Sequence, residues 1–158
     1  MFREMRRKKQ ELTGEEIDRI LHSNTSGVLA VSGDDDYPYS VPLSYTYNDG
    51  KLYFHCAKEG HKLDGIKRND KVSFCVIDQD KVIPKDLTTH YRSVIIFGRA
   101  RILTGDDERR SALEKLGAKY SADYEEDTQK AITTEWERVC LVEIEIEHVT
   151  GKAAIELI

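Results

Sequence analysis

The chain has 158 residues, of which 39% are hydrophobic and 34% charged, and its formal net charge is −5 at pH 7. This length suits one domain over residues 1–158, and this balance excludes an intrinsically disordered chain. No apolar run approaches the ~20 residues of a membrane helix, and the net negative charge argues against nucleic acid as the main partner.

The number and placement of the cysteines, and the composition of the N-terminal segment, indicate in which cellular compartment the protein is expected. Cys56, Cys75 and Cys140 are odd in number and lie in apolar, strand-like runs, so we expect buried thiols in a reducing compartment and no disulfide framework. The basic N-terminal segment is not followed by the apolar stretch of a secretory signal. We therefore expect a cytoplasmic protein without a membrane partner.

The first two predicted elements are a helix and a strand. Thr13 and Glu16 form a capping-box pattern, which predicts a helix that begins after Thr13 and ends near Asn24. Its apolar positions recur at helical spacing: Ile17, Ile20 and Leu21. The apolar run at residues 27–31 predicts a short buried strand, followed by an acidic turn.

Residues 37–47 form a long β-type segment interrupted by prolines. Because Pro38 and Pro42 cannot donate to a ladder, parts of this segment are expected at a sheet edge or bulge. The following Asn-Asp-Gly, residues 48–50, is a strong hairpin signal, so residues 51–57 should form the returning strand.

The middle of the chain predicts a short helix and two further strands. Residues 60–69 read as the helix, and residues 71–77 alternate as a strand should. A polar loop through Pro84 then leads to a long strand at 92–103.

The last third is more acidic. Asp106 or Asp107 is expected to cap a helix, and residues 120–136 look loosely helical. One face of the capped helix is apolar: Ala112, Leu113 and Leu116. Residues 139–149 predict a final strand that has one face in water, carrying Glu143, Glu145 and Glu147.

These elements predict a mainly β fold of the α+β type. About six strands joined by hairpins, with two or three helices at the ends and corners, indicate an antiparallel barrel or sandwich. A Rossmann or P-loop nucleotide site is not expected, since neither the strand–helix–strand alternation nor the glycine signatures are present.

The densest cluster of reactive side chains lies at residues 55–62. A metal site using His55, Cys56 and His61 is disfavoured, because neighbouring strand residues point to opposite faces and no second cluster supplies ligands. Gly60 at a helix start, with His61 and Lys62 beside it, predicts a seat for one phosphate. A solvated basic first turn is the alternative interpretation.

No catalytic constellation is visible in the sequence. Ser40, Ser44 and Ser93 are ordinary strand residues, and none lies in a nucleophile elbow. The only tryptophan, Trp136, is more typical of a core or interface anchor than of a group that stacks on a cofactor.

An ordered set of segments resembles the pyridoxamine 5′-phosphate oxidase-related superfamily, in its nitroimidazole-resistance (nitroimidazole reductase-like) branch. The segments are residues 27–30, 37–45, 50–57 and 60–64, continued by 69–76 and 93–100. This resemblance implies a six-stranded antiparallel split β-barrel that works as a homodimer, with FMN at the subunit interface.

The resemblance also implies roles for individual residues. Five would follow the isoalloxazine edge, mainly through backbone groups: Val41, Pro42, Leu43, Ser44 and Tyr45. Three would line the ribityl side: His55, Cys56 and Ala57. Gly60, His61 and Lys62 would hold the phosphate, Ser93 would reach the cofactor from the partner subunit, and Trp136 would lie at the rim.

One departure narrows the expected activity. Relatives that oxidise pyridoxamine phosphate carry an arginine-led motif where this chain has Val41-Pro42-Leu43, so that reaction is not expected. We expect an FMN-dependent oxidoreductase that reduces nitroaromatic compounds, with His55 or His61 as the proton donor. The alternatives are a flavin-binding or sensing module without turnover, and a relative that holds haem or a deazaflavin.

Overall fold

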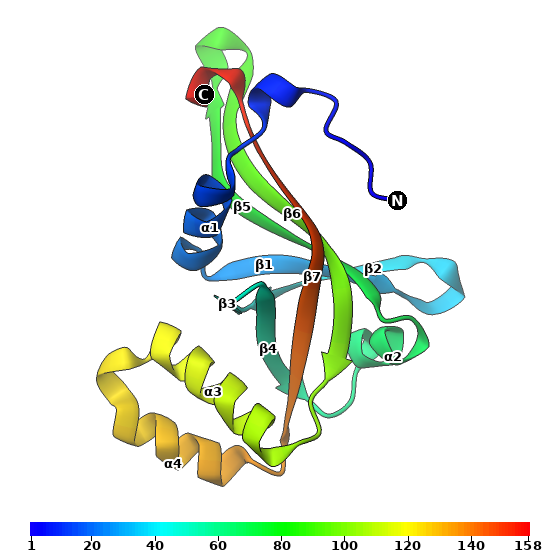
Figure 1. The fold of residues 1–158 in the computed structure, drawn as a ribbon, viewed down its shortest axis with the longest axis vertical. Helices are drawn as coiled ribbons and strands as arrows, with labels where there is room; N and C mark the ends of the chain where they lie inside the picture. The colour runs from blue at the N-terminus through cyan, green and yellow to red at the C-terminus, as the bar shows by residue number, and fades with distance from the viewer.

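The computed structural model describes residues 1–158 and contains one seven-stranded antiparallel sheet in the order β2-β1-β5-β6-β7-β4-β3 (Figure 1). The strands are β1 (Ser26–Ser32), β2 (Pro38–Ser44), β3 (Thr46–Asn48), β4 (Lys51–Ala57), β5 (Lys71–Ile83), β6 (Thr88–Ile102) and β7 (Val139–Ala153). The helices are α1 (Gly14–Ser23), α2 (His61–Arg68), α3 (Asp106–Tyr120) and α4 (Glu125–Glu135). Short 3₁₀ turns lie at η1 (Lys8–Gln10), η2 (Asp34–Asp36), η3 (Pro84–Asp86), η4 (Ala122–Tyr124) and η5 (Ile155–Leu157).

The predicted mainly β split barrel is confirmed, with seven strands in place of six and four helices in place of two or three. The extra strand arises because the segment at 37–47 divides at Tyr45 into β2 and β3. The expected hairpin at residues 48–50 is present, and Asp49 and Gly50 adopt φ of 50° and 74°. Such left-handed values are those of a turn that matches the twist of the flanking strands.

Hydrogen bonds do not close the barrel. β2 and β3 are the two edges of the sheet, and β2 pairs only with β1. β3 covers β4 only along residues 51–53, so residues 55–57 of β4 have β7 on one side and no strand on the other. The split therefore lies between the open edge of β2 and the open end of β4.

One main core fills the barrel, and α1 closes one end of it. Phe54, Phe74, Ile96 and Ile144 come from the inner faces of four strands and are fully buried. The apolar stripe of α1 joins them: Ile17, Ile20 and Leu21. The predicted capping box is confirmed, because the Thr13 hydroxyl accepts the Glu16 N–H at 3.2 Å while Glu16 accepts the Thr13 N–H at 2.8 Å.

A second, smaller core forms on the outer face of the sheet, where α3 covers β4 and β7. Its buried members are Tyr53, Leu103, Ala112, Leu116 and Leu141. The prediction that Glu143 faces water is therefore wrong, since only 8% of the residue is exposed. Its carboxylate instead lies 3.5 Å from Arg101 and 3.9 Å from Lys51.

Two other predictions are corrected. The polar loop expected through Pro84 is largely strand, because β5 continues to Ile83 and pairs with the start of β6. Residues 79–92 thus form a hairpin that extends beyond the rest of the sheet, called the projecting arm below (Figure 1). Gly105, and neither Asp106 nor Asp107, is the N-cap of α3, and Glu108 accepts the Gly105 N–H at 3.1 Å. Arg101 lowers the pKa of the partly buried Glu108 to about 2, chiefly through its hydrogen bond to that carboxylate.

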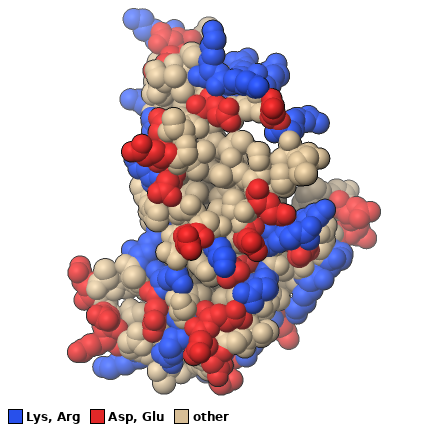
Figure 2. Space-filling model, viewed as in Figure 1, with Lys and Arg blue, Asp and Glu red and all other residues tan.

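Charged side chains are spread unevenly over the surface. Figure 2 shows acidic and basic groups interspersed over α3 and α4 and again at the opposite end of the molecule, with a charge-free area between them at mid-height. No helix combines the length and the apolar character that crossing a membrane requires.

Candidate functional site

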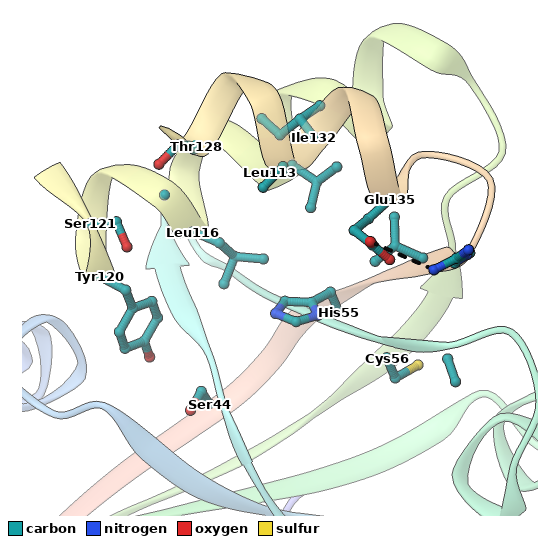
Figure 3. A pocket seen from close by; sticks show the side chains of 15 residues that line it. Ser44, His55, Cys56, Leu113, Leu116, Tyr120, Ser121, Thr128, Ile132 and Glu135 are labelled. Atoms are coloured by element: carbon teal, nitrogen blue, oxygen red, sulfur yellow. Dashed lines mark ion pairs between the residues drawn. The ribbon is translucent and has the colours of Figure 1, made fainter. Parts of the chain in front are cut away.

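The largest cavity lies at the split, between the open end of β4 and the hairpin formed by α3 and α4 (Figure 3). Its volume is about 580 Å³, within the range of ~300–1,000 Å³ that small-molecule sites occupy. The sheet contributes Ser44, His55, Cys56, Ala57 and Val139. The helices and their flanks contribute Leu113, Leu116, Gly117, Tyr120, Ser121, Thr128, Ala131, Ile132, Glu135 and Arg138.

Backbone groups on both sides of the split are free to bind a ligand. Pro42 lacks an N–H, so its pairing with Val28 is the non-hydrogen-bonded kind, and Ser40 and Ser44 share this orientation two residues away. The C=O group of Pro42 and the N–H and C=O groups of Ser40 and Ser44 therefore point away from β1. By the same alternation, the Ile146 N–H bond to Gly50 directs the backbone groups of His55 and Ala57 away from β7.

His55 is the histidine that lines the cavity. It is exposed, and in Figure 3 its imidazole lies beneath Leu116, between Tyr120 and Glu135. The structure gives it no hydrogen bond to the rest of the protein. Its two ring nitrogens can therefore donate to or accept from a bound molecule.

Cys56 lines the same cavity but is not an activated nucleophile. Burial raises the pKa of its thiol to about 11, with a further contribution from Cys140, its direct partner on β7, while the Lys62 ammonium acts in the opposite direction. A thiol that stays protonated at neutral pH is a poor nucleophile and a poor metal ligand. No group of three or more His, Cys, Asp or Glu residues is arranged to hold a metal ion.

The N-terminus of α2 has the features of an anion seat. Gly60 precedes the helix with φ of 153°, a backbone conformation that side chains rarely adopt, and no side chain caps the free N–H groups of the first turn. Lys62 is half-buried and its charge acts on Cys56, which lines the cavity. Gly60, His61 and Lys62 themselves do not line the cavity.

His61 is oriented differently from Lys62. Its ring stacks on Tyr39 with centroids 4.0 Å apart, and its Nε2 accepts the Asp34 N–H at 3.3 Å. The side chain thus ties α2 to the turn between β1 and β2. Its contribution to the seat is the backbone N–H and the remaining ring nitrogen.

The segment at residues 41–45 divides into inward and outward members. Val41 and Leu43 pack against the main core, and Tyr45 is fully buried with its hydroxyl donating to Leu21 at 2.8 Å. Pro42 and Ser44 are exposed, so they are the two members that face the open side.

Ser93 and Trp136 do not line the cavity. Ser93 pairs with Ile77 and Lys152 in the half of β6 that leads to the projecting arm. Trp136 follows α4 and lies on the other side of the hairpin, where the Arg109 guanidinium is 4.1 Å from its ring centroid. Both predicted contacts would need a second subunit or a different ligand position.

Tyr120 is a site residue that the sequence analysis did not identify. Its hydroxyl oxygen accepts the Tyr45 N–H at 3.1 Å and lies within hydrogen-bonding distance of the carbonyl oxygens of Thr25, at 2.6 Å, and of Tyr45. Burial raises the pKa of this phenol, so it remains a hydroxyl. It fixes the end of α3 over the junction of β2 and β3, a contact that no local pattern encodes.

The family model for pyridoxamine 5′-phosphate oxidase matches residues 13–153. The chain belongs to this family. Pyridoxamine 5′-phosphate oxidase-like proteins bind flavins, which agrees with a site built from open strand edges and a helix N-terminus. A search of curated protein sequences found no match.

Solved structures related to this pyridoxamine 5′-phosphate oxidase family member share its fold. An FAD-binding protein of Mesorhizobium loti is 28% identical, with a TM-score of 0.66 over 92% of this chain and 97% of its own. A candidate 5-nitroimidazole antibiotic resistance protein of Bacteroides thetaiotaomicron is 20% identical, with a TM-score of 0.74 over 90% and 86%. An FAD- and haem-binding protein of Mycobacterium smegmatis is 18% identical, with a TM-score of 0.79 over 92% and 73%.

Proposed function

We propose that this protein is a homodimeric, FMN-dependent oxidoreductase that reduces flat aromatic acceptors such as nitroaromatic compounds. The observation that carries the proposal is the position of Cys56 at the open end of β4, where it lines the cavity beneath the α3–α4 hairpin and lies close enough to Lys62, at the uncapped start of α2, to be affected by its charge. A phosphate seat, a polar strand edge and an apolar chamber in this order match the parts of a flavin mononucleotide and its substrate.

The residues present fit this cofactor. The N–H groups of His61 and Lys62 and the Lys62 ammonium would hold the phosphate, because a helix N-terminus and a cation both favour negative charge. The free backbone groups of Pro42, Ser44 and His55 would bind the polar rim of the ring system. Lys62 would also keep the phosphate close to Cys56.

The flavin and the protein would have separate roles in the reaction. When bound, the flavin supplies the electron transfer, and the protein supplies binding, orientation and protons. His55 is the one side chain that lies free in the cavity with a titratable proton, so it would donate that proton to the reduced acceptor. His61 is not suited to this role, since its Nε2 is bonded to Asp34.

The homodimer is supported by the outer face of the sheet. Two rows of directly paired residues cross β2, β1, β5, β6 and β7 there without a charged side chain: Pro42–Val28–Cys75–Ile95–Thr150 and Ser40–Ala30–Ser73–Phe97–His148. Ile95 and Phe97 are 43% and 42% exposed in the single chain. An uncharged face of this extent favours burial against a second copy, which would also bring a partner wall to the split.

Cofactor binding is tested with the purified protein. FMN titration should quench flavin fluorescence with a stoichiometry of about one per chain, and Lys62→Gln should weaken the affinity by about tenfold, the loss of one charged phosphate contact. Lys67→Gln, on the last turn of the same helix, is the matched control and should bind FMN normally. A protein that takes up no flavin would end the proposal.

Turnover is tested by NAD(P)H-driven bleaching of the bound flavin and its reoxidation by a nitroaromatic acceptor. His55→Ala should retain FMN and slow the acceptor half-reaction, whereas His61→Ala should leave that rate unchanged. Flavin that is bound but never reoxidised by the acceptor would favour a non-catalytic flavin-binding module.

The dimer is tested by light scattering. Ile95→Glu places a charge in the middle of the uncharged face and should give a monomer with weakened FMN binding. Val82→Glu, on the projecting arm and 65% exposed, should remain dimeric. A monomeric wild-type protein saturated with flavin would refute the interface.

Haem is the second candidate ligand, and one observation favours it. The His55 imidazole lines the mostly apolar cavity without a hydrogen-bond partner in the protein, so it is the residue that would bind the haem iron. The FAD- and haem-binding protein from Mycobacterium smegmatis has the same fold. A Soret band that forms on haem titration and is lost in His55→Ala would establish this alternative.

A further inference from the structure

The cavity beneath the α3–α4 hairpin has one wall formed by the sheet and one formed by the helices, and only the sheet wall belongs to the proposed cofactor site. Its sheet wall carries Ser44, His55, Cys56 and Ala57, all of which belong to the proposed cofactor site. The helical wall is mostly apolar, and the proposed cofactor contacts make no use of it: Leu113, Leu116, Ala131 and Ile132.

The geometry of the hairpin keeps α4 away from the sheet. α4 packs mainly on α3 and η4, and no strand is among its principal neighbours. Gly117 allows the two helices to approach closely, because a Cβ at this position would lie 2.5 Å from Thr128 Cγ2. The apolar face of α4 is therefore held by α3 opposite an open chamber.

Both ends of the hairpin are anchored, so the chamber is part of the fold. Arg109 donates to the carbonyl oxygens of Trp136 at 2.7 Å and Val139 at 3.0 Å, which fixes the chain where it leaves α4. Tyr120 fixes the far end of α3 to Tyr45. Ile132 and Leu116 are already buried, so the open apolar surface of the chamber is formed chiefly by Leu113 and Ala131, against which a small ligand would pack.

The polar groups of the chamber define what that ligand carries. The Arg138 guanidinium nitrogen lies 3.8 Å from a Glu135 carboxylate oxygen at one rim of the chamber. Because these two charges offset each other, the chamber favours an uncharged ligand. His55 offers hydrogen bonds from the sheet side of the chamber, and Ser121 and Thr128 offer them from the helical side.

We propose that α4 is the specificity wall of the enzyme: a flat, uncharged heteroaromatic acceptor binds between α4 and the flavin, and Ala131 and Ile132 limit its size. This inference rests on the proposed function and adds to it where the acceptor binds and which residues limit its size. Ala131 is the critical position because it lines the chamber with the smallest possible side chain and is exposed, so enlarging it fills the chamber without disturbing a core.

The test uses the flavin-loaded protein and benzimidazole, an uncharged aromatic probe that is not reduced. Benzimidazole binding is followed by calorimetry and by the shift in the visible flavin spectrum. Ala131→Phe should weaken benzimidazole binding by about tenfold or more and leave FMN affinity unchanged, because the added ring occupies the chamber. Lys130→Phe, at the preceding exposed position of α4 that does not line the chamber, is the matched control and should bind both ligands as the wild type does.

Three results would overturn the inference. Ala131→Phe could bind benzimidazole normally, it could lose FMN, which would mean that the chamber holds the cofactor itself, or haem could displace benzimidazole from the wild type. A wild-type protein that binds no flavin fails at an earlier step, which distinguishes failure of the proposed function from failure of this inference.

Discussion

α1 and α4 are helices of similar length, yet the protein uses their apolar residues in different ways. The stripe of α1, with Ile17, Ile20 and Leu21, is inserted into the main core and closes the barrel. α4 has a single buried residue, Ile132, and faces a chamber of about 580 Å³. A filled apolar face indicates a part of the fold, and an apolar face held over open space indicates a part of the site.

The largest effect is expected at the filled face. Ile20 is fully buried, so Ile20→Ala should lower the free energy of unfolding by about 2–5 kcal/mol through lost burial and a new cavity. Urea denaturation followed by far-UV circular dichroism measures it. A cost below about 1 kcal/mol would mean that α1 is dispensable to the core.

The same change on α4 should cost less. Ile132→Ala removes a side chain whose one flank already faces the chamber, so the free energy of unfolding should fall by only about 1–2 kcal/mol. The same denaturation experiment applies, with Ile20→Ala as the reference. Equal costs for the two variants would contradict the distinction between the helices.

The spacing of the hairpin can be perturbed directly. Gly117→Ala should destabilise the protein by about 1–2 kcal/mol, because the new methyl group would overlap Thr128 Cγ2. The free-energy cost of this overlap should exceed the gain in helix propensity that alanine brings to α3. Thr128→Ser removes that methyl group, so the double variant should recover most of the loss in a double-mutant cycle. Additive single effects would show that the helices do not meet there.

The smallest effect concerns the ends of the two helices. α1 starts with a capping box, whereas no side chain caps α4 at Tyr124. Thr13→Ala should therefore cost about 1 kcal/mol, measured as a lower urea midpoint with an unchanged slope. Thr133→Ala, within α4, is the control and should change the urea midpoint little. An equal fall in the midpoint for both variants would mean that the cap of α1 contributes no specific stability.

Local patterns in the sequence predicted the parts of the fold that depend on neighbouring residues. The capping box of α1, the hairpin at Asp49-Gly50 and the strand Lys51–Ala57 are all confirmed. Each depends on hydrogen bonds or turn geometry within a few residues. The phosphate seat at Gly60 was predicted for the same reason, since a helix start is a local feature.

Features that depend on long-range packing were not predictable in this way. Glu143 alternates as a surface residue should, and only the placement of α3 over β7 buries it. The acidic segment at residues 120–136 looked like a solvated helix, because its charged residues outnumber the few that face the chamber. The apolar face noted at Leu113 and Leu116 was the one signal that could have led to the cavity.

The prolines of β2 have a consequence for how the single chain meets other chains. Pro38 and Pro42 share the orientation that points to the unpaired edge, so that edge lacks two of the amide donors that an incoming strand would need. The single chain therefore presents a poor template for edge-to-edge aggregation, even though its barrel stays open. The same edge still offers carbonyl oxygens and serine amides, which suits recognition of a small polar ring over extension of the sheet.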